Sequence, residues 1–218
     1  VFARSSIGLM VVNKESMHYP QDNDSLRAIY PKFNRNVGLE YNLASPNNVW
    51  TGKAFLLQSF SPDSLGNGFT QAANVEYKSR EWNWGVQEQS VAEDYRAEVG
   101  YVPRNGYVNI NSFVGYLFFP KGGIVLDHGP KIGLNYFFDQ RLNRTDNTNE
   151  FSYLVQFRDR SELTSSFGNE FVELLKPFDP TQSGNVPLPI GSRHFWNALT
   201  MQYVSKPQSM FTYTVSGR

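Results

Sequence analysis

The chain has 218 residues, a formal net charge of zero and no cysteine. Neutrality gives no electrostatic reason to expect nucleic acid as the main partner, and the lack of cysteine excludes disulfides and thiolate metal sites. There is no run of about eighteen apolar residues, which excludes a transmembrane helix. The chain begins at Val1 without an initiator Met or a signal peptide, so we expect a mature or partial chain.

Aromatic residues make up 15% of the chain, yet its mean hydropathy is -0.45. A soluble domain with this many aromatic residues would usually carry more aliphatic core residues. The combination is typical of a membrane β-barrel, which has aromatic residues on its outer face and a polar lumen. An aromatic-rich soluble sandwich is the alternative.

Apolar and polar residues alternate along most of the chain. In residues 150–160, for example, Phe151, Tyr153 and Val155 share one face of a strand, because successive side chains point to opposite sides. No segment keeps a period of 3.6 over a helical length. In chain order, the alternation predicts eleven strands in or near 5–12, 36–44, 49–60, 69–81, 82–91, 107–119, 131–140, 150–160, 161–171, 194–204 and 210–218.

The predicted connections alternate between long and short. Residues 15–32, 61–68, 93–106, 141–149 and 176–193 form the long ones, and turns such as 45–48 and 120–123 lie between them. In an outer-membrane barrel, every second connection is a tight periplasmic turn and the others extend outward. We therefore expect the loops 15–32, 93–106 and 176–193 to face outward and to meet partners.

These patterns predict an all-β chain folded as an antiparallel, up-and-down transmembrane β-barrel, with residues 1–218 in a single domain. Strands in lipid must close into a barrel to satisfy every backbone N–H and C=O group. Eleven is an odd number, whereas bacterial barrels have even numbers of strands. We therefore expect the chain to be a segment of a longer barrel.

Charged residues on the predicted polar faces are the candidates for lining the lumen: Glu40, Lys53, Glu76, Lys78, Arg80, Glu88, Lys131 and Arg158. The alternative is that they decorate the solvated face of an open sheet. Aromatic residues towards the strand ends are the candidates for the membrane girdles, where amphipathic rings sit at headgroup depth: Trp82, Trp84, Tyr116, Phe118, Tyr136 and Phe138. Trp50 and Trp196 are the best candidates for sugar stacking.

No catalytic, cofactor or metal site is predicted. The three histidines, His18, His128 and His194, lack metal-ligand spacing. The segments 22–25 and 146–149 are rich in oxygen ligands for Ca²⁺, but turn chemistry explains them better. Pairs of carboxylates that a glycoside hydrolase would need, such as Glu88 with Asp94 or Glu162 with Glu170, are non-specific among twenty acidic residues.

Three stretches, "SSIGLMVVNKES" (5–16), "YRAEVGYVPRNGY" (95–107) and "FGNEFVELLKPFDPTQSGNVPLPIGSRHFW" (167–196), resemble a family of large Gram-negative outer-membrane proteins. That family joins an N-terminal carbohydrate-binding module of the family 9 type to a C-terminal β-barrel domain of unknown function. The resemblance implies that the chain lies within the barrel domain. It also implies a location in the cell outer membrane and leaves the chemistry open.

We therefore expect a surface anchor or channel associated with glycan binding or uptake, and not an enzyme. Its expected partners are outer-membrane lipid and lipopolysaccharide, with glycans or a surface or secretion protein complex as further ones. One alternative is a passive barrel subunit of such a complex. The other is a soluble all-β enzyme that acts on glycans.

Overall fold

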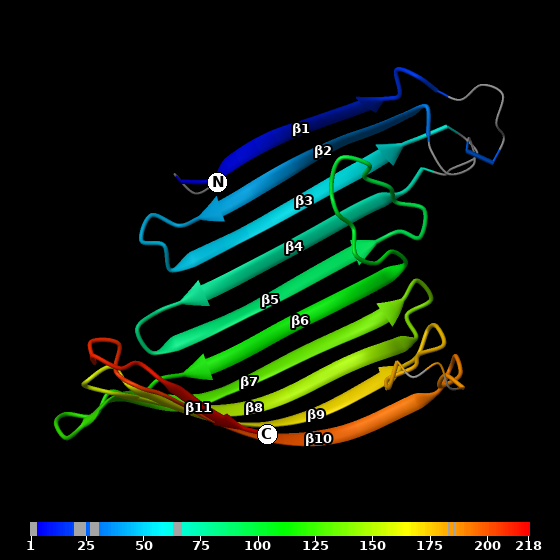
Figure 1. Ribbon diagram of the computed structural model, residues 1–218. Coiled ribbons are helices and arrows are strands. Elements are labelled where there is room, and N and C mark those ends of the chain that lie inside the picture. The colour runs from blue at the N-terminus through cyan, green and yellow to red at the C-terminus, as the bar shows by residue number, and fades with distance from the viewer. Residues whose placement is uncertain (1–3, 20–24, 27–30, 63–66, 183, 185) are drawn as a thin grey trace. The chain divides into compact units, whose positions relative to one another are not determined.

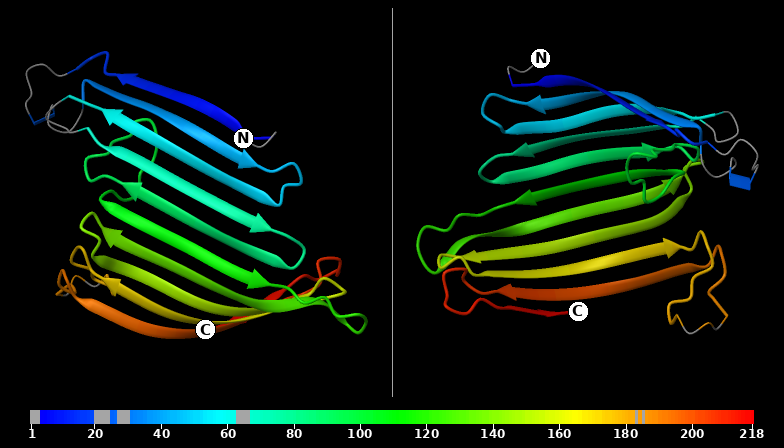
Figure 2. Two further views of the ribbon diagram at one scale, coloured as in Figure 1. Left: turned by 180° about the vertical axis from the view of Figure 1, so that it is seen from behind. Right: turned by 45° about the horizontal axis from the view of Figure 1, so that its top comes forward.

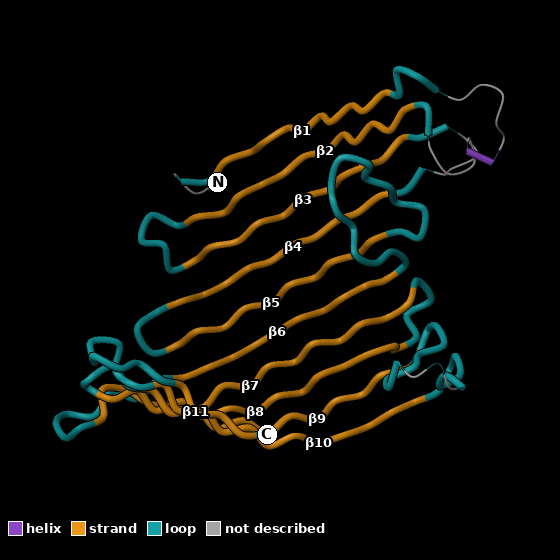
Figure 3. Tube along the Cα trace, in the orientation of Figure 1, coloured by secondary structure: helices purple, strands orange, loops and turns teal. Residues whose placement is uncertain are grey.

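The computed structural model describes residues 4–19, 25–26, 31–62, 67–182, 184 and 186–218. Within them the chain forms one sheet of eleven antiparallel strands, in which each strand pairs with the next along the chain (Figure 1). The described residues between the strands form loops and turns, apart from a helical segment at residues 25–26 (Figure 3). Their bounds are β1 (Ser6–Glu15), β2 (Phe33–Ala44), β3 (Trp50–Phe60), β4 (Phe69–Lys78), β5 (Trp82–Val91), β6 (Tyr107–Tyr116), β7 (Val125–Asp139), β8 (Arg144–Phe157), β9 (Glu162–Glu173), β10 (Arg193–Val204) and β11 (Thr214–Gly217).

The all-β, antiparallel, up-and-down prediction is confirmed, but the sheet is not closed into a barrel. β1 and β11 are its two edges, and among the described residues neither has a second neighbour. β11 has four residues and pairs only with Met201–Val204 of β10. The strand order from β1 to β11 can be followed by colour in the right-hand view of Figure 2. These eleven strands therefore do not make a closed barrel by themselves.

The tight turns owe their shape to residues with positive φ. Asn48, Leu142 and Arg160 have φ of 55°, 62° and 70°, and each donates its N–H to the carbonyl three residues earlier. Such turns reverse the chain within a few residues, so the strands on both sides stay in register. The connections 16–32, 92–106 and 174–192 are long, as predicted, and all three lie at the same end of the antiparallel strands.

One predicted long loop is wrong. Residues 141–149 were expected to be a loop, but β7 and β8 are joined by a turn of four residues, 140–143. Asp139 fixes this turn, because its carboxylate accepts hydrogen bonds from the N–H groups of Arg141 and Asn143, both at 2.8 Å. The oxygen-rich segment 146–149 therefore lies within β8. The other such segment, 22–25, lies outside the described residues except for Ser25.

The contacts between residues divide the chain into two compact units. The first comprises residues 1–76, 87–109 and 138–143, and so contains β1, β2 and β3 with the loop 92–106. The second comprises residues 77–86, 110–137 and 144–218, and so contains β8 to β11.

The first unit has one apolar and one polar side. Leu9, Leu39 and Leu56 lie directly opposite one another on β1, β2 and β3, with exposed fractions of 71%, 59% and 52%. On the other side of β2, Asn34 and Asn36 are buried. This reverses the arrangement of a soluble sheet, in which polar residues face water and leucines face the core.

The second unit repeats this pattern. Phe151, Phe167 and Leu199 form a row across β8, β9 and β10, and each is at least half exposed. The next row across the same three strands consists of Ser152, Ser166 and Thr200. These side chains point to the opposite side of the sheet.

A row of asparagines interrupts the apolar side of the second unit. Asn149, Asn169 and Asn197 lie directly opposite one another on β8, β9 and β10. The Asn169 amide donates to the Asn197 side-chain oxygen at 2.9 Å, while the side-chain oxygen of Asn149 is buried without a partner in the described part of the chain. The apolar side is therefore not a continuous aliphatic surface.

Few apolar residues are buried. Within the described ranges, the buried hydrophobic side chains are those of Val91, Ala92, Tyr95, Tyr107 and Phe171. Four of these five lie in or beside the loop 92–106, so the main core of the first unit is under that loop. Among the residues that the structure describes, no helix has the length and apolar character needed to cross a membrane.

Candidate functional site

The loop between β5 and β6, residues 92–106, folds back across the polar side of the first unit. We call it the strap; in Figure 1 it is the green loop in front of β3 and β4. Its two ends are held together, because the Gly106 N–H donates to the Val91 carbonyl at 3.0 Å. The Asn105 amide donates to the carbonyls of Tyr95 (2.7 Å) and Glu93 (3.2 Å). These bonds close the strap on itself.

Buried polar side chains of the sheet fasten the strap. Asn34, which is 1% exposed, donates to the Arg96 carbonyl at 3.1 Å and accepts from the Glu98 N–H at 3.0 Å. The Arg96 N–H donates to the Ser59 hydroxyl at 3.3 Å. A Cβ at Gly68 would lie 2.2 Å from the Tyr95 nitrogen, so the close approach of strap and sheet needs glycine there.

An ion cluster reinforces this attachment. Lys14 of β1 lies with its Nζ 3.2 Å from Glu98 Oε2, and the Arg96 guanidinium donates to the other oxygen of the same carboxylate. Burial alone would raise the pKa of Glu98. The hydrogen bonds and charges of Arg96 and Lys14 outweigh it and hold that pKa below its ordinary value. Glu98 is therefore ionised at neutral pH and links the strap to β1.

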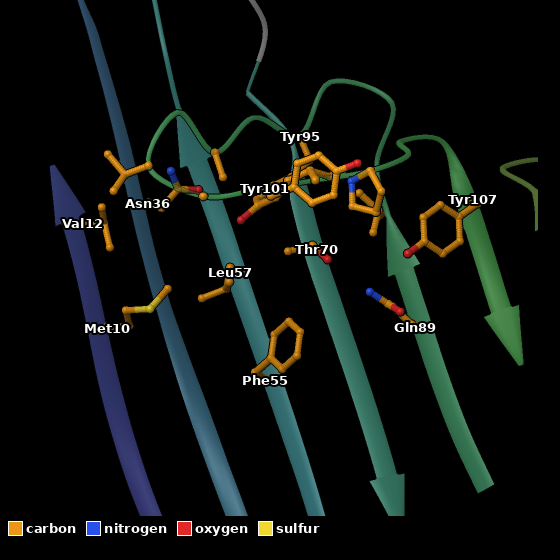
Figure 4. A pocket seen from close by; sticks show the side chains of 16 residues that line it. Met10, Val12, Asn36, Phe55, Leu57, Thr70, Gln89, Tyr95, Tyr101 and Tyr107 are labelled. Atoms are coloured by element: carbon orange, nitrogen blue, oxygen red, sulfur yellow. The ribbon is translucent and has the colours of Figure 1, made fainter. Parts of the chain in front are cut away.

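A cavity lies between the strap and the sheet. Its volume is about 400 Å³, and residues of β1 to β6 and of the strap line it (Figure 4). Met10, Phe55 and Leu57 contribute apolar surface from the sheet, and Tyr95 and Tyr101 come from the strap. Burial raises the pKa of the Tyr95 phenol, so this group stays neutral.

Two predicted lumen residues are brought together on the polar side. Lys53 Nζ lies 2.9 Å from Glu40 Oε2, and both side chains are about half exposed. Glu76 and Lys78 flank Tyr77 in β4 and therefore point to the side opposite that ring. Lys131 lies with its Nζ 4.8 Å from the centre of the Phe113 ring.

Two further predicted lumen residues lie in turns. The Arg80 guanidinium sits 4.7 Å from the centre of the Phe119 ring. The Arg158 Nε donates to the Gly123 carbonyl at 2.8 Å. Both therefore belong to the end of the sheet where the short turns lie, and not to the middle of its polar side.

The predicted placement of Glu88 is wrong. It has the same parity in β5 as Trp82 and Trp84, so the three side chains point to the same side. It also lines a shallow groove with Leu39 and Leu56 of the apolar side. Glu88 is therefore a charged residue on the aromatic side of the sheet.

Several predicted girdle residues contact one another. Trp82 packs edge-on against Tyr116, with ring centres 4.9 Å apart, and Tyr116 packs in the same way against Phe118 at 4.8 Å. Phe118 stacks on His128 at 5.3 Å. Trp84 stacks on Tyr77 at 5.9 Å. These rings gather near the short turns 79–81 and 117–124, whereas Tyr136 and Phe138 lie near the other end of β7.

The remaining candidates do not assemble into one site. The ring of His128 lies 2.6 Å from the Tyr153 hydroxyl, and that of His194 lies 3.2 Å from the Ser192 hydroxyl. His18 is exposed in the turn after β1. Within the described residues, no group of three or more His, Cys, Asp or Glu side chains is placed to hold a metal ion.

The proposed carboxylate pairs do not converge either. Glu162 and Glu170 are eight residues apart in β9, or ~27 Å along the strand, which is beyond the separation that glycoside hydrolysis requires. Glu88 lies on the apolar side, and Asp94 belongs to the strap on the polar side. Trp196 lies opposite Glu170 on the polar side, as its parity predicted, and Trp50 begins β3.

The strap was not recognised as a site from the sequence, although one of the three stretches that carry the family resemblance, 95–107, covers most of it. The signal for it in the sequence is the run Val99–Pro103, which contains no charged residue in an otherwise polar loop. No family model, no curated protein and no solved structure matches this chain.

Proposed function

We propose that the chain is part of the wall of an outer-membrane β-barrel, which serves as a surface anchor or channel associated with glycan binding or uptake. The observation that carries this proposal is the row Leu9, Leu39 and Leu56, which is exposed on a side that no second layer covers within the described residues. A sheet of a soluble domain buries its apolar side against another layer. In a membrane barrel, lipid acyl chains contact the apolar side of a single sheet and take the place of a second protein layer.

The dimensions of the apolar side agree with this environment. In β10, the aromatic residues Phe195 and Tyr203 lie on the same side, eight positions apart, which is ~27 Å along the strand. At the strand tilt of ~40° found in membrane barrels, this corresponds to ~20 Å across the bilayer, close to the ~25 Å apolar band of such proteins.

The polar side supplies the complementary surface. The Glu40–Lys53 pair and the charged residues Glu76 and Lys78 would face the lumen. The proposal includes further strands that close the barrel, because an open sheet edge in lipid would leave backbone N–H and C=O groups without partners.

The association with glycans rests on the family resemblance of residues 95–107 and 167–196, and it implies glycans and lipopolysaccharide as partners at the outer surface. In this orientation the long connections 16–32, 92–106 and 174–192 face outward, as does the turn 140–143. The connections at the opposite end, which include 117–124 and 205–213, face the periplasm.

Fluorescence quenching tests the lipid contact. The chain has four tryptophans, so variants can retain Trp82 and Trp84, or Trp196 alone. Trp82 on the apolar side and Trp196 on the polar side are similarly exposed, at 48% and 40%. In liposomes with brominated acyl chains we expect strong quenching of Trp82 and Trp84 and little quenching of Trp196. Equal quenching, or a protein that is monodisperse in buffer without detergent, would overturn the proposal.

Planar bilayers distinguish a channel from a passive subunit of a surface or secretion complex. Steady single-channel conductance of the reconstituted full-length protein supports a channel. A protein that passes the quenching test but carries no current is an anchor or platform.

A further inference from the structure

The cavity under the strap has the size of a binding site for a small molecule. Its volume of about 400 Å³ lies within the range of ~300–1,000 Å³ that is usual for ligand sites. One wall is regular sheet, and the other is a strap that is tied to the sheet by Asn34 and by the Glu98 ion cluster. The cavity is thus a half-open space between elements with defined attachments, and Tyr101 at its rim is 88% exposed.

In the described part of the chain, the lining is largely apolar and carries no charge. Met10, Val12, Leu57, Val91 and Val99 line it, and no described Asp, Glu, Lys, Arg or His contributes. The rings of Phe55, Tyr95, Tyr101 and Tyr107 provide flat surfaces (Figure 4). A charged ligand would lose its hydration without an ion pair in return. This lining therefore selects an uncharged molecule with a ring.

One polar group of the lining lacks a partner. Asn36 is 3% exposed, and its amide donates to the Asn34 side-chain oxygen at 2.9 Å. The side-chain oxygen of Asn36 has no hydrogen-bond partner in the described part of the chain. A buried acceptor without a donor is costly. The oxygen has almost no accessible surface, so a ligand reaches it only when the Asn36 side chain turns towards the cavity, and a ligand N–H or O–H group then supplies the missing donor.

We propose that this cavity binds an uncharged, mostly apolar ring compound that donates a hydrogen bond to Asn36. Ten of the sixteen lining residues are apolar or glycine, so a saccharide, which carries hydroxyl groups around its whole ring, would leave many of these groups against apolar surface. The inference rests on the cavity and does not depend on the proposed membrane function. The two proposals can be overturned separately, because the quenching of Trp82 tests the membrane function and the occupancy of this cavity tests ligand binding.

The test uses 2-naphthol, which is neutral at pH 7 and donates one O–H, and 2-methoxynaphthalene, which has a similar ring and no donor. Methyl-¹³C methionine labelling of the protein in nanodiscs gives signals that include those of Met10, Met17, Met201 and Met210. Met10 lines the cavity, whereas Met201 lies on the apolar side of β10 and reports partition into lipid.

We expect the Met10 signal to shift saturably with 2-naphthol and the Met201 signal to change only linearly. 2-Methoxynaphthalene should bind about tenfold more weakly than 2-naphthol, because a tenfold difference in affinity is what the loss of one hydrogen bond usually causes. Asn36→Leu should weaken 2-naphthol about tenfold and leave 2-methoxynaphthalene unchanged, while Ala97→Phe should fill the cavity and abolish the saturable shift.

A linear response of Met10, or equal affinities of the two compounds for the unmodified protein, would overturn the proposal. The comparison of the two compounds needs no variant, so it remains decisive if Asn36→Leu does not fold. If Asn36→Leu folds and still binds 2-naphthol with unchanged affinity, the assigned acceptor is wrong.

Discussion

Lys14 of β1 and Glu98 of the strap form an ion pair across 84 residues of sequence, with Nζ 3.2 Å from Oε2. The pair joins the first strand of the sheet to a loop that follows the fifth. It is supported by Arg96, which binds the same carboxylate, and by Asn34, which binds the Glu98 N–H. The attachment of the strap therefore depends on an ionised Glu98.

This dependence predicts an effect of pH. Because the pKa of Glu98 in the folded protein lies below its ordinary value, its contribution to stability is present above about pH 4.5 and is lost as the pH falls through the lower, folded-state value. Glu98→Gln should remove about 1–2 kcal/mol at pH 7 and flatten the dependence. Denaturation midpoints between pH 7 and pH 3 measure both effects.

Glu15→Gln is the matched control, because Glu15 pairs with Arg35 at 2.8 Å but both side chains are half exposed. Such a pair contributes little, so this variant should keep the pH dependence of the unmodified protein. An equal flattening by both variants would show that Glu98 has no special part in holding the strap.

A glycine comparison tests the packing of β7 against its neighbour. A Cβ at Gly129 would lie 1.7 Å from the Tyr116 carbonyl oxygen, whereas a Cβ at Gly133, in the same strand, would meet nothing within 4 Å. Gly129→Ala should lower the free energy of unfolding by about 1–3 kcal/mol, because the backbone of β6 has to move. Gly133→Ala should change the free energy of unfolding by less than about 0.5 kcal/mol, or raise it slightly. Denaturation in the same detergent measures both, and a comparable loss in both variants contradicts the geometry.

Neighbouring residues of β10 distinguish the two sides of the sheet. Leu199 is 61% exposed on the apolar side, and Thr200 points to the other side. If the apolar side faces lipid, Leu199→Arg should cost about 2–4 kcal/mol, as charged residues do near the middle of a bilayer. Thr200→Arg should cost less than about 1 kcal/mol. Unfolding from liposomes measures the difference, and an absence of any difference argues against the lipid assignment.

The Glu40–Lys53 pair predicts how a channel would select ions. Lys53→Glu replaces a positive charge near Glu40 by a negative one, so the reversal potential in a salt gradient should move towards cation selectivity. Glu40→Lys should move it towards anions, and the doubly exchanged variant should restore the original value. Because both side chains are about half exposed, each single change should leave the denaturation midpoint nearly unchanged. Unchanged selectivity in both single variants would exclude these residues from the ion path.

The sequence by itself determined the strands and their two-sidedness. The alternation in residues 36–44 and 150–160 predicts which side chains share a face, because a strand has a period of two whatever its neighbours are. The short polar segments between the strands also predict the positions of the tight turns, such as those at Asn48 and Arg160. The same period of two places Glu88 with Trp82 and Trp84 on one side of β5, so the sequence alone contains the information for its position.

Only the tertiary structure shows which contacts the connections between the strands make. The length of residues 92–106 predicts a loop, but nothing local indicates that it folds back onto Asn34 or that Glu98 reaches Lys14. Contacts over 60 to 84 residues depend on strand order and register, which follow from the packing of the whole sheet. For the same reason the turn at 140–143 was missed: the four-residue reversal is fixed by the hydrogen bonds of Asp139 once β7 and β8 are side by side.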